Sequence, residues 1–200
     1  ASAVDSNNNL ELDGRMLIAG NWNTSTQTID GAKSGHVCKD YTTQCNDTYK
    51  TSDFYILAPG TNINSVKNGG GYARMSGTSQ AAPVITGGVA IVHQLWPYMK
   101  GKNIAQLLLQ TANKDLSNYS ITTHGQGLLD LDKATQPVGG LGISLTGRTG
   151  ATTSISGSLS INGVDDSVIS SLSSMSAIDD FDRDFKVDLT SMIKQNDNLM

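Results

Sequence analysis

The residues with the clearest chemical potential are Met75 to Pro83, which read MSGTSQAAP. From Ser79 onward the residues are apolar or small, and this pattern predicts a buried helix that begins close to the serine. A hydroxyl in the first helical turn lies near unpaired backbone N–H groups and the positive end of the helix dipole. This arrangement stabilises an oxyanion of the kind that acyl transfer forms. The alternative interpretation is that Ser79 only caps the helix.

Several elements are expected to position this serine. Residues 15–20 form a short apolar run of strand length, and residues 53–60 form a second one closed by a Pro-Gly turn. Residues 67–72 predict a tight turn. The helix over residues 79–92 is apolar on every side, so we expect a central helix buried all round, with Pro83 in its first turn, where the missing N–H is not needed.

The rest of the chain divides by composition. Residues 103–112 predict a second amphipathic helix with Asn103 as its cap, and residues 125–131 predict a turn into a closing element. Pro137 ends the compact part. The expected organisation is a first domain over 1–136, a Gly/Ser/Thr-rich segment over 137–176 read as a linker or as thin alternating strands, and the start of another unit over 177–200.

The bulk composition limits the classes of function. Hydrophobic residues make up 38% and charged residues 16%, with 21 glycines, as in a soluble, loop-rich globular protein. We find no run of about 18 apolar residues that would span a bilayer. The formal net charge of −4, with no basic cluster, argues against a nucleic-acid partner. The chain begins at Ala1 rather than with methionine, so we expect a fragment.

Cys38 and Cys45 lie seven positions apart in a polar loop. A disulfide between them would close a short ring and would imply an oxidising compartment. Two free thiols remain an alternative. A metal site is the weakest interpretation, because zinc needs four ligands and only His36 lies near the pair.

The sequence GTSQAAP over residues 77–83 resembles the nucleophile motif of the subtilisin-like serine proteases, the subtilases of peptidase family S8. Residues 57–60, LAPG, resemble the strand end that precedes this motif in the family. Residues 125–130, GQGLLD, resemble the family's closing segment. The three matches occur in the family's order and cover roughly residues 15–136.

The resemblance implies an α/β fold with a mainly parallel sheet and a buried central helix, present here as a partial domain. It also implies a serine endopeptidase that hydrolyses peptide bonds through an acyl-enzyme on Ser79. In the family the order is aspartate, histidine, serine, so the triad partners and the oxyanion asparagine would lie upstream of this chain. The implied roles in this chain are oxyanion and backbone support from Gly77, Thr78 and Ser79, and a substrate-side surface from Met75 and Ser76. Gln80 departs from the family's methionine at that position.

Other polar residues are interpreted as structural. His36, His93 and His124 all lack the setting of the family's catalytic histidine. Asn21 and Asn23 follow Ala-Gly, as the family's oxyanion asparagine does, but they align better with a later strand. The resemblance implies no cofactor, although structural calcium is expected in a full domain, and it implies a polypeptide substrate.

Two alternatives stay open. One is a non-catalytic cell-surface binding or adhesion protein on a subtilase scaffold. The esterase elbow G-x-S-x-G does not fit, because Ala81 occupies its last glycine position.

The second open point concerns the tail. Residues 177–189 resemble the passage into the translocator of subtilase autotransporters. This resemblance implies secretion to the Gram-negative surface, with contact to the outer membrane through a downstream barrel. The competing interpretation is a disordered acidic tail.

Overall fold

The structure is a computed structural model that describes residues 16–31, 51–144, 152–154, 159–161, 170, 172–173, 175–190 and 193–195. The chain divides into two compact units, Ala1–Thr135 and Gln136–Met200. Within the described ranges, no helix combines the length and the apolar character needed to cross a bilayer.

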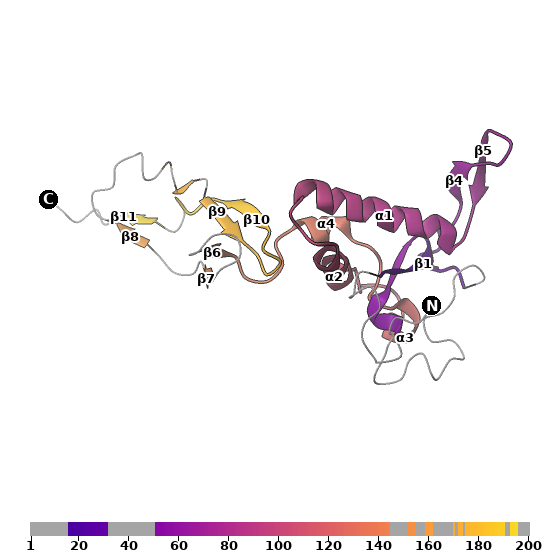
Figure 1. The fold of residues 1–200 in the computed structure, drawn as a ribbon. Helices are drawn as coiled ribbons and strands as arrows, with labels where there is room; N and C mark the ends of the chain where they lie inside the picture. Colours follow the sequence, from indigo (N-terminus) through magenta and orange to yellow (C-terminus); the bar gives the residue numbers. More distant parts are fainter. Residues whose placement is uncertain are drawn as a thin grey trace, which may run out of the picture. The chain divides into compact units, whose positions relative to one another are not determined.

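A small sheet forms the base of the first unit (Figure 1). Strand β1 (Ile18–Asn23) pairs in parallel with β3 (Tyr55–Pro59) and antiparallel with the short β2 (Thr28–Ile29). The closing segment then lies beside β3, where the N–H of Leu57 donates to the carbonyl of Gly127 at 2.8 Å and forms part of a parallel bridge. The mainly parallel sheet expected for an α/β fold is confirmed, although β1 begins later than the apolar run 15–20 suggested.

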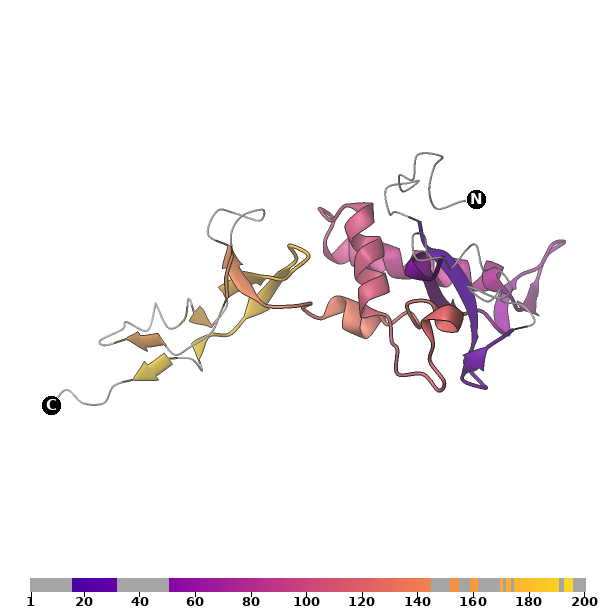
Figure 2. The same ribbon diagram turned by 90° about the horizontal axis from the view of Figure 1, so that it is seen from below.

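Helices cover this sheet and continue the chain (Figures 1 and 2). Helix α1 packs across β1 and β3, and α2 packs against α1 and α4. The bounds are η2 (Thr51–Phe54, a 3-10 helix), α1 (Thr78–Leu95), α2 (Gly101–Thr111), α3 (Ile121–His124) and α4 (Leu131–Thr135). The predicted cap of α2 was wrong: the helix begins two residues earlier, with Lys100 as N-cap, so Asn103 lies inside its first turn.

Burial of α1 is confined to one stripe, whereas the sequence predicted burial on every side. The buried residues Ala81, Ile85, Gly88 and Val92 recur every three or four positions, as one helix face does. Elsewhere Leu95 is 53% exposed. An apolar sequence shows that a helix tolerates burial, but the packing partners decide which faces are covered. The described partners, β1, β3, α2 and α4, account for one side.

Pro83 is the sixth residue of α1 and so lies just beyond the first turn, in which the sequence predicted it. At this position its missing N–H would have donated to the carbonyl of Ser79, four residues earlier. The first turn therefore lacks one of its regular hydrogen bonds.

The core of the sheet is aromatic and aliphatic. Trp22, Tyr55 and Leu57 are almost completely buried and contact one another. The partly buried hydrophobic residues packed against them are Ile18, Ile29, Leu116 and Leu128. The core thus joins β1, β3 and the closing segment into one body, on which α1 rests.

Two glycines join the end of β3 to the start of α1. The N–H of Gly60 donates to the carbonyl of Trp22 at 3.1 Å, and the carbonyl of Gly60 accepts from the N–H of Gly77 at 2.9 Å. A Cβ at Gly60 would lie 2.7 Å from the carbonyl oxygen of Gly77 and 3.0 Å from the Cβ of Ala81. Only glycine permits this approach. Gly77 itself has φ 151° and ψ 174°, a conformation essentially limited to glycine.

A β-hairpin separates β3 from α1 and stands out from the first unit (Figure 1). It consists of β4 (Ile63–Val66) and β5 (Tyr72–Met75), paired antiparallel. The predicted turn over 67–72 is confirmed: its three successive glycines, 69–71, all have positive φ values between 77° and 100°.

The second unit contains strands from the Gly/Ser/Thr-rich segment. Its sheets have the orders β10-β9-β6-β7 and β11-β8. The bounds are β6 (Gly142–Ser144), β7 (Thr152–Ser154), β8 (Leu159–Ile161), β9 (Met175–Ile178), β10 (Asp184–Val187) and β11 (Ile193–Gln195). Where residues 137–176 are described, they include β6, β7, β8 and the first two residues of β9. Alternation of aliphatic with Ser or Thr residues suits the two faces of a strand.

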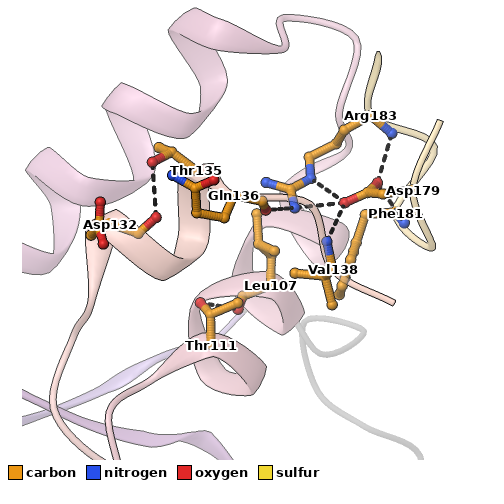
Figure 3. A network of polar contacts seen from close by, with 9 residues as sticks. All are labelled: Leu107, Thr111, Asp132, Thr135, Gln136, Val138, Asp179, Phe181 and Arg183. Carbon is orange, nitrogen blue, oxygen red and sulfur yellow. Dashed lines mark hydrogen bonds and ion pairs between the residues drawn. The ribbon is translucent and has the colours of Figure 1, made fainter. Parts of the chain in front are cut away.

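A buried ion pair organises the turn between β9 and β10 (Figure 3). The side chains of Asp179 and Arg183 are completely buried, and Arg183 Nη2 lies 2.6 Å from Asp179 Oδ2. Asp179 Oδ1 accepts from the N–H groups of Phe181 and Arg183, while Oδ2 accepts from the N–H of Val138 at 3.1 Å. Arg183 Nη2 also donates to the carbonyl of Gln136 at 2.8 Å. One carboxylate and one guanidinium thereby tie together two backbone segments, residues 136–138 and 179–183.

We predict that Arg183→Met strongly destabilises the second unit, by about 3 kcal/mol or more, because Asp179 would remain buried without its counter-charge. In the full-length protein, hydrogen exchange of peptides covering residues 175–190 should accelerate. Lys186→Met removes an exposed cation from β10 and serves as the matched control. Equal exchange in the two variants would contradict this role for the ion pair.

We also predict opposite effects for two glycine substitutions at α1. Gly77→Ala forces a non-glycine residue into a φ of 151° and should lower the free energy of unfolding by about 1–3 kcal/mol. Gly87→Ala lies on the exposed side, where a Cβ meets nothing within 4 Å, and should raise it by about 0.5–1 kcal/mol. Urea denaturation of both variants measures the change in the free energy of unfolding. Changes of the same sign in the two variants would contradict the different roles given to Gly77 and Gly87.

Candidate active site

Ser79 is the second residue of α1, and it is exposed. The first bonds within the helix run from the N–H groups of Gln80 and Ala81 to the carbonyl of Gly77, at 3.0 and 3.2 Å. The N–H groups of Thr78 and Ser79 precede these bonds, so the helix itself offers them no acceptor. An exposed hydroxyl and backbone donors thus share the positive end of an 18-residue helix.

The candidate substrate-side residues lie where β5 leads into α1. Met75 ends β5, and its Sδ lies 3.8 Å from Gln80 Nε2. Ser76 Oγ accepts from the N–H of Asn62 at 2.9 Å, which ties the two ends of the hairpin together. Both Met75 and Ser76 are half-buried next to the exposed serine. The Gln80 side chain therefore packs back onto β5, where the sequence had shown only a departure from the family's methionine.

A polar cluster lies at the carboxyl ends of β1 and β3. Thr61 Oγ1 is 3.2 Å from Asn21 Oδ1 and 3.1 Å from Asp30 Oδ2. The Asn21 side chain is completely buried, and its Oδ1 would lie 2.5 Å from a Cβ at Gly60. This position supports the loop behind Gly60 rather than a surface open to substrate. Asn23 accepts from the N–H of Ser25 at 3.0 Å and so stabilises the turn after β1.

The histidines that the structure describes lie apart from Ser79 in the hydrogen-bond network. His93 is exposed late in α1, and His36 is outside the described residues. His124 is 92% buried, with its ring near Trp22 and Tyr119. Its Nδ1 accepts from the N–H of Ser120 at 3.2 Å. These contacts belong to α3 and the residues just before it, where burial also raises the pKa of the Tyr119 hydroxyl.

The remaining candidates are the two cysteines and the residue types that could bind a metal ion. Cys38 and Cys45 lie outside the described residues, so their pairing stays a prediction. Within the described ranges, no three His, Cys, Asp or Glu side chains gather in a way that would hold a metal ion.

Sequence reasoning missed the supporting residues of the site. Thr61 and Asp30 act through Asn21, and nothing in their local sequence marks them. Gly60 was read only as part of a Pro-Gly turn, although its close approach to Gly77 positions α1. A glycine on each side of the hairpin was the one signal available, since close backbone contacts favour glycine.

A protein-family model and several known proteins match parts of this chain. The model of the subtilase family, peptidase S8, matches residues 3–129. A thermostable alkaline protease of Halalkalibacterium halodurans is 40% identical over 81 residues, covering 40% of this chain and 22% of that protein. Proteinase R of Parengyodontium album is 34% identical over 123 residues, covering 58% of this chain and 32% of that protein. The chain therefore spans between about a fifth and a third of the length of these relatives.

Among solved structures, fervidolysin from Fervidobacterium pennivorans, a keratinolytic enzyme related to subtilisin, matches with a TM-score of 0.44 and 25% identity. The match covers 70% of this chain and 23% of that one. The self-cleaved protease domain of PatA matches with a TM-score of 0.42 and 25% identity, covering 60% and 40%. The family model covers well over half of the chain, including the serine at the start of α1, and the chain belongs to the subtilase family of peptidases.

Proposed function

We propose that the protein containing this chain is a serine endopeptidase and that Ser79 is its nucleophile. The observation that carries the proposal is the exposed Ser79 hydroxyl at the start of α1, beside backbone N–H groups that precede the first helical hydrogen bonds. Membership of the subtilase family supports the same reaction. A serine used only as a helix cap would accept from a backbone N–H, and α1 has Gly77 at its N-cap position with no side-chain cap.

The proposed reaction proceeds through an acyl-enzyme. Ser79 Oγ attacks the carbonyl carbon of the scissile peptide bond while a histidine takes its proton, and the resulting oxyanion accepts from the Ser79 N–H. The histidine then gives the proton to the leaving amine as the C–N bond breaks. Water, activated by the same histidine, attacks the ester and releases the acid product. Gly77 and Thr78 hold the helix start, and Met75 and Ser76 line the leaving-group side.

The activating groups are proposed to come from further sequence of the same protein, N-terminal to Ala1. Two features support this. The relatives are about three to five times longer than the matched part, from the shares of 22% and 32%. The outer face of α1 carries exposed aliphatic side chains such as Ile91, which further sequence would cover. A serine without its histidine is a weak nucleophile, so we expect the 200-residue chain alone to be inactive.

We further propose that the protein works outside the cytoplasm, with a Cys38–Cys45 disulfide and calcium sites in the complete domain. Residues 1–136 would be the peptidase part. The segment 177–189, with its acidic alternating pattern, supports a passage into an autotransporter translocator. The strands of the second unit suit a folded junction there.

We predict that a fluorophosphonate probe labels the full-length protein and that Ser79→Ala abolishes the labelling. The probe phosphonylates only a serine whose hydroxyl is activated by a base and whose oxyanion is stabilised. Intact mass before and after treatment measures one adduct on the wild type and none on the variant. Loss of labelling should accompany a fall of several orders of magnitude in peptide hydrolysis.

Ser117→Ala, which removes an exposed hydroxyl from a loop of the same unit, is the matched control and should label fully. A folded wild-type protein that takes up no probe would reject the peptidase. The alternative would then be a non-catalytic binding or adhesion protein on the subtilase scaffold.

A further inference from the structure

The β4–β5 hairpin presents an exposed face directly before the nucleophile. Directly opposed residues share one face of an antiparallel pair, and the register pairs Val66 with Tyr72 and Asn64 with Arg74. All four side chains are exposed, with Val66 at 72% and Tyr72 at 76%. An aliphatic–aromatic pair and a polar pair thus stand in solvent on one surface, which we call the hairpin face.

The charge of this region has one sign. From residue 54 to residue 114 the sequence contains no aspartate or glutamate, although the whole chain has a net charge of −4. The hairpin carries Lys67 in its turn and Arg74 on β5. Among the described residues neither cation has an ion-pair partner. The hairpin face therefore attracts carboxylates.

The hairpin also offers backbone groups. Within the described residues, β4 and β5 form a two-stranded sheet and pair only with each other, so each has an edge that can accept another extended strand. Strand β5 ends at Met75, and Ser76 and Gly77 join it to α1, whose second residue is Ser79. At about 3.3 Å per residue, Tyr72 lies roughly 13 Å along the strand from Ser76.

We propose that the hairpin face binds the polypeptide substrate on the leaving-group side, about three to five residues beyond the scissile bond. It favours there an extended segment in which an acidic residue stands next to an apolar one. The acidic side chain pairs with Lys67 or Arg74, and the apolar side chain packs on Val66 and Tyr72. This inference rests on the proposed function, since it needs Met75 and Ser76 to line the leaving-group side.

An acidic polypeptide fits this face better than a second copy of the chain. Two copies paired through the same hairpin edge would bring Lys67 and Arg74 of one copy close to those of the other. Like charges opposite each other destabilise strand pairing. Complementary charge therefore favours a substrate segment.

The test uses the full-length protein and two fluorescence-quenched peptides. A cleaved bond is first found by mass spectrometry in a digest of a proteome-derived peptide library. Both peptides keep the residues around that bond and carry either Asp-Leu-Asp or Lys-Leu-Lys at the third to fifth positions beyond it. We expect kcat/KM to be about three- to tenfold higher for the acidic peptide at low salt, and the ratio to fall towards one at high salt.

The variant Lys67→Glu/Arg74→Glu should invert this preference, whereas Lys114→Glu, a matched reversal of an exposed cation elsewhere in the unit, should keep it. A peptide that ends two residues beyond the bond should be cleaved equally by all three proteins.

If Ser79 takes the probe and both peptides are cleaved, but the charge-reversed variant keeps the wild-type ratio, the inference fails and the peptidase stands. If the probe does not react and neither peptide is cleaved, the proposed function fails first. A wild-type dimer that the double substitution dissociates, seen by sedimentation, would assign the face to a second copy instead.

Discussion

The close contact between the end of β3 and the start of α1 determines where Ser79 lies. A side chain on Gly60 would collide with the carbonyl of Gly77, 2.7 Å from the Cβ position. Without that side chain, one hydrogen bond from Gly77 to Gly60 fixes the helix start to the sheet edge. The same glycine is bonded to Trp22 in the core. Hydrogen bonds through two glycines therefore connect the buried sheet to the start of α1. The position of Ser79 is fixed by the core, although its side chain is exposed.

The sequence predicted the parts of this arrangement that depend on local pattern. The apolar run before Gly60 and the long helix after Gly77 follow from composition, and the family motifs around Ser79 place them in order. The extent of α1's burial did not follow, because the same apolar residues occur on covered and uncovered faces. The position of Pro83, one turn into the helix, was also missed. Local propensity rejects a proline there, but packing of α1 on β1 and β3 outweighs it.

The two units obtain their order from different interactions. The first relies on a hydrophobic core around Trp22 and on backbone pairing between distant segments. In the second, the described strands are short and rich in small polar residues, and a completely buried pair, Asp179 and Arg183, organises the β9–β10 turn. A buried ion pair adds little stability compared with a well-packed apolar pair, but it requires a specific geometry. Every oxygen of Asp179 has a backbone donor, so the turn tolerates one arrangement. The sequence showed the charges of this turn but not which of them would be buried.

The parallel pairing of the closing segment with β3 has a consequence for how the protein is made. Leu57 donates to Gly127 and accepts from Leu129, so the sheet is completed only when residues about seventy positions apart meet. Contacts of such long sequence separation form slowly, because the intervening chain must lose its freedom first. During synthesis on a ribosome, β3 and α1 emerge well before residues 126–129. The loop around Ser79 therefore acquires the support of the closing strand late, after most of the unit has left the ribosome.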